Sequence, residues 1–247
     1  MGVEYRHYLV PRPSNFMPAA EQLAGFINAL AAERWILTPD SAEFGKRTNV
    51  NVPRESAATG ATISHRQRER KPAPFPLTVA ALEPLIDRHT RLLWHFFDPT
   101  TCRLQHPLTP IDRLPFDETY YDIGFEWSPS LVYRQSECID PFDKTTCSCG
   151  TELAFEDETA PFYSSFIQAR CPKCARSTDV STWRALYHDG LTGEETTVSG
   201  GATSRFVLIV DCGKGFPADG PMALKPGLVA AFRNALRCDC YEIGDFY

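Results

Sequence analysis

The first part of the chain carries two different hydrophobic patterns. Residues 3–10, VEYRHYLV, are rich in aromatic and β-branched residues and predict a strand, and the proline-rich residues 11–17 predict a turn. Residues 18–34 have apolar side chains at helical spacing, with Pro18 suited to the first turn of a helix. Residues 35–37, Trp-Ile-Leu, predict a second strand. The expected buried face of this helix comprises Leu23, Phe26, Ile27 and Leu30.

The last part of the chain repeats this order of patterns. Residues 204–213, SRFVLIVDCG, predict a strand, and a turn-rich connection leads to a predicted helix at 227–237. Residues 238–247 predict a closing strand. Each end is therefore a strand, loop, helix, strand unit, and two such units commonly form a sheet with helices on one face. We expect an α+β fold. The apolar face of the second helix comprises Leu228, Val229, Phe232 and Leu236.

The middle of the chain is less regular. Residues 76–97 contain a long apolar run that predicts a helix, which Pro84 would kink or divide because proline lacks a backbone donor. Residues 119–128 and 130–135 predict strands. Residues 46–74 are polar and basic, and we expect them to form a flexible, solvated loop.

Composition places the chain among soluble globular proteins. It has 247 residues, is 43% hydrophobic and carries a formal net charge of −6. The N-terminal residues lack the apolar run of a signal peptide, and no window approaches the length of a membrane span. We therefore expect a cytoplasmic location and no membrane partner. Nine cysteines is an odd number, and in a reducing compartment it favours metal binding or simple burial over a disulfide framework.

Four of these cysteines form two close pairs. Cys147 and Cys149 lie in CSCG, and Cys171 and Cys174 lie in CPKC. Thiolates in such turns are the ligands that Zn²⁺ prefers in tetrahedral sites, and the proline in CPKC fixes its turn. The segment over about residues 144–182 resembles the zinc-ribbon family, in which two cysteine turns lie at the tips of β-hairpins. The family usually has two residues between the first two ligands and a glycine after the second pair, where this chain has Ser148 and Ala175.

The predicted zinc site has competing ligands. Cys138 precedes the first pair and His188 follows the second, so either could replace a proposed ligand. Cys238 and Cys240 form a further pair, but alternation along a strand would point both into the core. Four thiolates leave no open coordination position, so the zinc would be structural rather than catalytic.

The cysteine segment interrupts the pattern of the rest of the chain, which suggests an insertion. We predict an inserted zinc-binding module at residues 137–182 and an α+β body formed by residues 1–136 together with 183–247. The ends of such a module should lie close together on the surface of the body.

Motifs for catalysis are not found in the sequence. It lacks a G-x-S-x-G elbow, a phosphate loop, an H-E-x-x-H helix and a dinucleotide fingerprint. His89 and His95, six residues apart, would face different ways on one helix, and the other histidines suggest surface or core-edge positions. Four carboxylates could converge if the C-terminal strands are neighbours, and paired carboxylates can perform acid/base chemistry. They are Asp211, Asp239, Glu242 and Asp245.

Three functions are consistent with these patterns. The first is a non-enzymatic protein-binding protein, for example a cytoplasmic inhibitor or immunity protein, with a structural Zn²⁺. Its motivation is the set of acidic and aromatic residues in FDETYYDIGFEW and FEDETAPFY, which would suit a basic protein partner. The second is an enzyme whose site consists of acidic and histidine residues. The third is a nucleic-acid-binding zinc-ribbon protein that uses Arg66, Arg68, Arg70 and Lys71, although an acidic chain repels phosphate.

Overall fold

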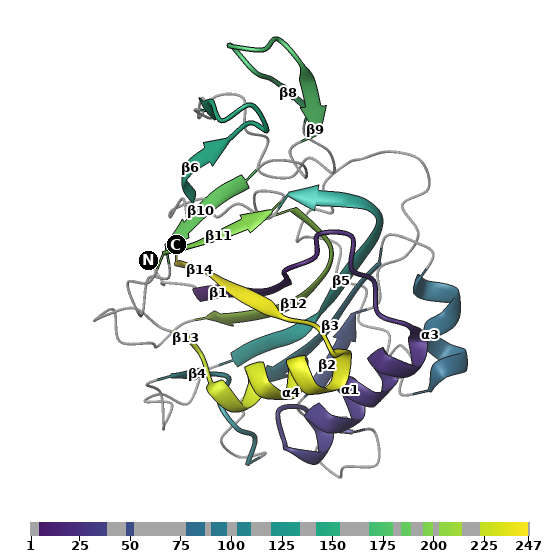
Figure 1. Ribbon diagram of the computed structural model, residues 1–247. Coiled ribbons are helices and arrows are strands. Elements are labelled where there is room, and N and C mark those ends of the chain that lie inside the picture. Colours follow the sequence, from purple (N-terminus) through teal and green to yellow (C-terminus); the bar gives the residue numbers. More distant parts are fainter. Residues whose placement is uncertain are drawn as a thin grey trace.

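A six-stranded antiparallel sheet forms the body of the molecule, in the order β14–β1–β12–β5–β3–β2 (Figure 1). The computed structural model describes residues 5–38, 48–51, 78–86, 90–97, 103–109, 120–133, 142–153, 168–179, 184–188, 195–199, 203–213 and 223–246. The strands are β1 (Tyr5–Pro11), β2 (Thr48–Asn51), β3 (Thr90–Phe97), β5 (Tyr120–Tyr133), β12 (Thr203–Gly213) and β14 (Cys240–Phe246). Strand β1 lies between β12 and β14 in this sheet, so the first strand of the chain pairs with strands from its last part.

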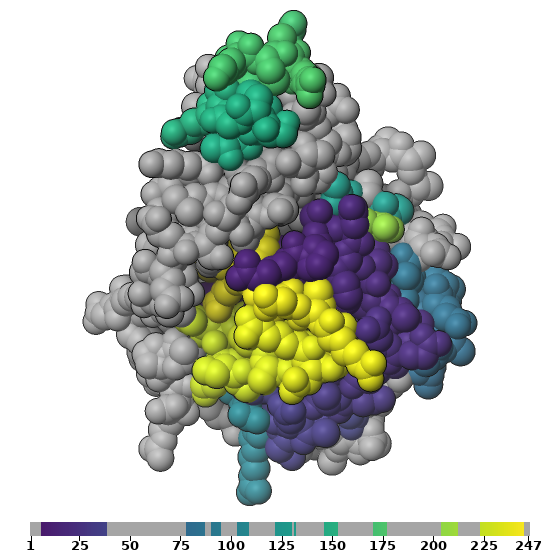
Figure 2. Space-filling model, in the orientation of Figure 1, coloured from purple at the N-terminus to yellow at the C-terminus, as the bar shows by residue number. Residues whose placement is uncertain are grey.

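Helices cover one face of this sheet, which confirms the α+β class (Figure 1). They are α1 (Ala20–Ala32), α3 (Val79–Ile86) and α4 (Pro226–Leu236). The start of α1 is tied to the end of α4 because Gln22 Nε2 donates to the Leu236 carbonyl oxygen at 3.1 Å. In Figure 2 the two helices lie side by side at the surface.

Aromatic side chains fill the space between the helices and the sheet. Phe26 of α1 lies edge-on to Phe125 of β5 and to Phe232 of α4, each with ring centroids 5.5 Å apart. Phe206 of β12 stacks on Phe125 at 5.9 Å. Edge-on and offset contacts of this kind add to the stabilisation from burial. The predicted apolar faces of both terminal helices are confirmed, with Leu23, Phe26, Ile27, Leu30, Leu228, Phe232 and Leu236 buried and Val229 partly buried.

Three smaller sheets complete the described structure. A four-stranded sheet has the order β11–β10–β6–β7, and β8–β9 and β13–β4 are two-stranded. The strands are β4 (Leu108–Thr109), β6 (Phe142–Thr146), β7 (Glu152–Leu153), β8 (Gln168–Arg170), β9 (Ser177–Asp179), β10 (Arg184–His188), β11 (Glu195–Ser199) and β13 (Ala223–Leu224). Strand pairing therefore continues beyond the predicted end of the inserted module at residue 182. The module boundaries remain a prediction.

The strand predicted at Trp35–Leu37 is wrong. All three side chains are buried, but their backbone forms no strand and follows the C-terminal turn of α1. Arg34 adopts a left-handed conformation with φ of 64°, and the N–H groups of Arg34 and Trp35 donate to the carbonyls of Ala31 and Leu30. This pair of hydrogen bonds is a Schellman motif, which satisfies carbonyls that the helix end leaves unpaired.

The helix predicted over residues 76–97 is correct only in its first half. Residues 79–86 are helical with Pro84 inside, and residues 90–97 form β3 instead. Thr90, Leu92 and Trp94 are buried at the two-residue period of a strand. The strand β3 packs so closely against β5 that a Cβ on Gly124 would lie 2.0 Å from the Leu92 carbonyl oxygen.

Two further predictions concern residues of this sheet. Part of the predicted basic loop forms a strand, because Thr48–Asn51 is β2 and pairs with β3, while residues 52–77 lie outside the described ranges. His95 stands in β3 opposite Asp122 rather than on a helix, and His89 is outside the described ranges. None of the helices that the structure describes combines the length and apolarity needed to cross a membrane.

Candidate metal centre

The first cysteine pair lies in the tight turn between β6 and β7. The Gly150 N–H donates to the Cys147 carbonyl oxygen at 2.8 Å, and the Cys147 N–H donates to the Thr151 carbonyl oxygen at 2.8 Å. Gly150 has φ of 82°, a left-handed conformation that glycine adopts without steric cost. Gly150 thus provides, without steric cost, the left-handed residue with which this turn ends.

The second cysteine pair lies in the turn between β8 and β9. The Ala175 N–H donates to the Cys171 carbonyl oxygen at 2.9 Å, and the Cys171 N–H donates to the Arg176 carbonyl oxygen at 3.1 Å. Ala175 adopts φ of 56°, so it takes the same left-handed conformation as Gly150 in spite of its Cβ. The missing glycine therefore does not change the form of the turn.

The two turns bring their four sulfur atoms together. Cys147 Sγ lies 3.8 Å from Cys174 Sγ, and Cys149 Sγ lies 3.7 Å from Cys171 Sγ. All four Sγ atoms lie within 4.8 Å of one another. Figure 2 shows the two segments in contact at one end of the molecule. The four cysteines that the sequence indicated thus form one cluster that could hold a metal ion.

Hydrogen bonds to sulfur favour thiolates in this cluster. The side chain and backbone N–H of Thr151 lower the pKa of the Cys149 thiol to about 6. The backbone N–H of Cys174 is the main group that lowers the pKa of Cys171, as expected for a turn whose amides point at sulfur. The Arg176 N–H also lowers the pKa of Cys174, but burial and the three neighbouring thiols together raise it to about 11.

These pKa shifts indicate that negative charge on the four sulfurs favours a bound cation. The lowered pKa values of Cys149 and Cys171 favour the thiolate form, whereas burial and the neighbouring thiols raise the pKa of Cys174. A divalent cation at the centre would remove the repulsion among negatively charged sulfurs and allow all four to bind as thiolates. The donor set is soft and therefore suited to Zn²⁺ or iron rather than to Ca²⁺ or Mg²⁺.

Of the two competing ligands, the structure describes only the backbone position of His188. Cys138 lies outside the described ranges. His188 ends β10, opposite Glu195 in the strand register, and only its backbone position is described.

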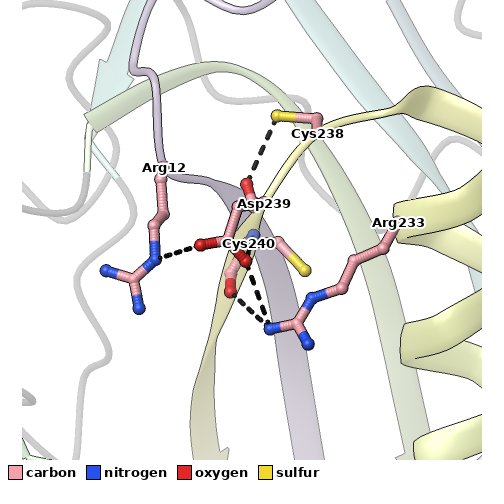
Figure 3. Close-up of polar contacts among 5 residues, drawn as sticks. All are labelled: Arg12, Arg233, Cys238, Asp239 and Cys240. Atoms are coloured by element: carbon pink, nitrogen blue, oxygen red, sulfur yellow. Dashed lines mark hydrogen bonds and ion pairs between the residues drawn. The ribbon is translucent and has the colours of Figure 1, made fainter.

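Cys238 and Cys240 are core residues, as predicted. Both are buried among the apolar side chains that the helices cover. Figure 3 shows the Cys238 thiol directed at the Asp239 carbonyl oxygen, to which it donates a hydrogen bond with 3.3 Å between Sγ and the oxygen. Burial raises the pKa of both thiols, that of Cys240 to about 11. Such thiols are poor nucleophiles and poor metal ligands at neutral pH.

The acidic residues near the C-terminal strands are held in separate ion pairs. Asp211 Oδ2 accepts from Arg6 at 2.9 Å. Asp239 lies between two guanidinium groups, at 2.8 Å from Arg12 Nε and 3.3 Å from Arg233 Nη2 (Figure 3). The side chain of Asp245 is outside the described part. Among the described side chains these two carboxylates thus pair with different cations: Asp211 joins β12 to β1, and Asp239 joins the start of β14 to the end of β1 and to α4.

The histidine positions hold one contact that the sequence did not predict. His7 is buried in β1, and its Nδ1 lies 2.6 Å from Glu242 Oε1 of β14. The same carboxylate oxygen accepts the Leu224 N–H at 2.9 Å. His106 is also buried, and its Nδ1 accepts the Leu108 N–H at 3.1 Å. The residues of the His7 pair are far apart in sequence, so no local pattern could reveal it.

The aromatic residues proposed for a protein interface are partly core residues. Phe125 and Trp127 have no exposed surface, and Glu126 between them is also buried. They belong to β5, whose alternating side chains pack under the helices. The second stretch, residues 155–163, lies outside the described ranges.

Comparisons with known proteins add no relative. A scan of protein-family models, a search of curated proteins and a search of solved structures each found no match. The likeness to a zinc ribbon therefore depends on the four cysteines and the two turns alone.

Proposed function

We propose that this protein is a non-enzymatic binding protein in which Cys147, Cys149, Cys171 and Cys174 hold a structural Zn²⁺. The spacing of the sulfur atoms carries the proposal. In a tetrahedral site with Zn–S bonds of about 2.3 Å, the sulfurs stand about 3.8 Å apart. The two closest pairs of the cluster are separated by 3.8 and 3.7 Å. These two distances support the proposal of a zinc site, and all four sulfurs lie within 4.8 Å of one another.

A structural role follows from the number of ligands. Four thiolates complete a tetrahedron and leave no position for water or substrate. The ion would join β8–β9 to the sheet that contains β6 and β7, since strand pairing within the described ranges does not connect them. Short hairpins of this kind bury little apolar surface, so the metal would supply much of their folding free energy.

Exposed charged side chains flank the proposed metal centre. Arg170, Lys173 and Arg176 are exposed, and the first turn contributes exposed Glu152. Three cations and one carboxylate give a net charge of +2, which the charge of −2 on a Zn²⁺ with four thiolates would offset. An acidic patch on a partner would pair with the three exposed cations, and the basic partner expected from the aromatic stretches stays a prediction.

Elemental analysis of the purified protein tests the metal. We expect close to one zinc per chain, because four thiolates hold the ion against exchange at neutral pH. Iron would fit the same sulfur geometry and would give a coloured protein, so the analysis includes it. Protein that takes up neither metal, even after reduction and incubation with Zn²⁺, would refute the proposed centre.

Affinity capture with zinc-loaded protein tests the binding role. A stoichiometric protein partner should be retained at low salt and lost with Lys173→Glu, which reverses a charge beside the metal without removing a ligand. Lys225→Glu, the same charge change at the start of α4, serves as the matched control and should retain the partner. Capture of no stoichiometric partner at any salt concentration would contradict this role.

A further inference from the structure

The four sulfurs of the cluster differ in exposure. Cys147 and Cys171 are buried, with 3% and 1% of their surface exposed, whereas Cys149 is exposed and Cys174 is intermediate. A small oxidant dissolved in water therefore reaches Cys149 more easily than the other three. Among four thiolates bound to one metal, exposure decides which sulfur a dissolved oxidant reaches first.

The nearest sulfur to Cys149 among the measured pairs belongs to the other hairpin. Its Sγ lies 3.7 Å from Cys171 Sγ, and the second cross-hairpin pair, Cys147 and Cys174, lies at 3.8 Å. A disulfide bond is about 2.05 Å long, so each pair must approach by less than about 2 Å. A bond between Cys147 and Cys149 would instead distort the tight turn that the Gly150 N–H closes.

We propose that the cluster is an oxidation site for hydroperoxides, at which Cys149 reacts first and Cys171 converts it to a cross-hairpin disulfide with loss of zinc. This inference depends on the zinc centre proposed above. The second disulfide, Cys147 with Cys174, follows once the metal has left. The oxidised cluster then holds the two hairpins together by covalent bonds instead of metal bonds.

The reaction balances with peroxide as the oxidant. The Cys149 thiolate attacks one peroxide oxygen, the O–O bond breaks, and the sulfur becomes a sulfenic acid while the other oxygen leaves as water after taking a proton. The Cys171 thiolate attacks the Cys149 sulfur, the S–O bond breaks, and the hydroxide takes a second proton and leaves as water. Formation of each disulfide thus supplies two electrons to one peroxide, and formation of the first one frees the Zn²⁺.

Hydrogen peroxide added to zinc-loaded protein tests the inference. Zinc content is measured first, so that its absence refutes the zinc centre itself. A chromogenic chelator then follows zinc release, and mass spectrometry of non-reduced peptides maps the disulfides. We expect zinc release to be complete near about one equivalent of peroxide and both disulfides near about two, with the Cys149–Cys171 disulfide present at the earliest times and full rebinding of zinc after reduction.

Core cysteines provide the internal control. Cys238 and Cys240 should remain reduced while zinc is released, and the Cys238→Ser variant should release zinc at the wild-type rate. Zinc that stays bound in excess peroxide would overturn the inference and leave the metal centre intact. A first disulfide between Cys171 and Cys174, or between Cys147 and Cys149, would overturn it as well, as would sulfinic acid formation without any disulfide.

Discussion

Replacing one ligand of the second turn should release the metal and free one hairpin without unfolding the body. In Cys171→Ser or Cys174→Ser, a neutral hydroxyl takes the place of a thiolate, and the remaining three sulfurs no longer complete the tetrahedron. We expect such protein to contain little zinc after purification.

The size of the effect follows from how β8 and β9 are attached. These strands pair with each other and not with the other described sheets. Structural zinc contributes roughly 10–16 kcal/mol to the folding of isolated zinc peptides at neutral pH. Loss of even about 3 kcal/mol at this site would raise the population of the open hairpin more than about 100-fold. The sheet and its helices keep their own aromatic core, so the far-ultraviolet circular dichroism should change little.

Limited proteolysis with trypsin measures this opening. The second turn carries exposed Arg170, Lys173 and Arg176, which are cleavage sites that the metal would hold in a fixed turn. Cleavage there should be fast in the Cys171→Ser variant and in chelator-treated wild-type protein. Cys238→Ser is the control and should keep both its zinc and its resistance. The reasoning fails if changes at Cys238 or Cys240 remove the metal and changes at Cys171 or Cys174 do not.

Two predictions concern the body. Phe232→Ala should lower the free energy of unfolding by about 3–5 kcal/mol in urea denaturation, because the ring is fully buried against Phe26 and Phe206; a loss below about 1 kcal/mol would contradict this packing. Burial lowers the pKa of His106 to about 4. Between about pH 6.5 and 4 the imidazole therefore binds a proton in the unfolded chain but stays neutral in the folded chain. Stability should therefore fall between about pH 6.5 and 4, by at most about 3 kcal/mol, and His106→Gln should lose that part of the slope; an unchanged slope would refute the assignment.

The terminal units were predictable where burial is one-sided. Apolar residues at three- and four-residue spacing identify α1 and α4, because each helix buries a single face against the sheet. The β-branched run of β12 likewise identifies a central strand. In these elements the local pattern and the tertiary packing favour the same structure.

Two segments were not predictable because continuous apolar runs carry no period. Residues 90–97 contain apolar side chains on both faces, and such a run fits a buried strand as well as a helix. Residues 35–37 are buried and apolar without being a strand, because the left-handed Arg34 turns the chain back onto α1. Here tertiary contacts, rather than spacing, decide the backbone conformation.

The candidate metal centre was also predictable only in part. Cysteine spacing predicted which residues form the cluster, because close pairs in turns leave few geometric alternatives. It did not predict the left-handed Ala175 or the pairing of sulfurs across the hairpins. The contact of His7 with Glu242 was equally inaccessible, because it depends on β1 and β14 being neighbours in the sheet.

The sheet register shows where the segment with the cysteine turns leaves the body and returns to it. Strand β5 ends at Tyr133, β12 begins at Thr203, and these two residues are partners across the sheet. The chain therefore leaves the six-stranded sheet and returns to it at adjacent positions, as expected of an insertion, and residues 134–202 include both cysteine turns. The β5–β12 pairing and the aromatic core are formed by residues outside this segment, so we expect the metal to stabilise the hairpins and the aromatic core to stabilise the sheet. This separation is the reason that metal loss should open one hairpin and leave the circular dichroism of the body nearly unchanged.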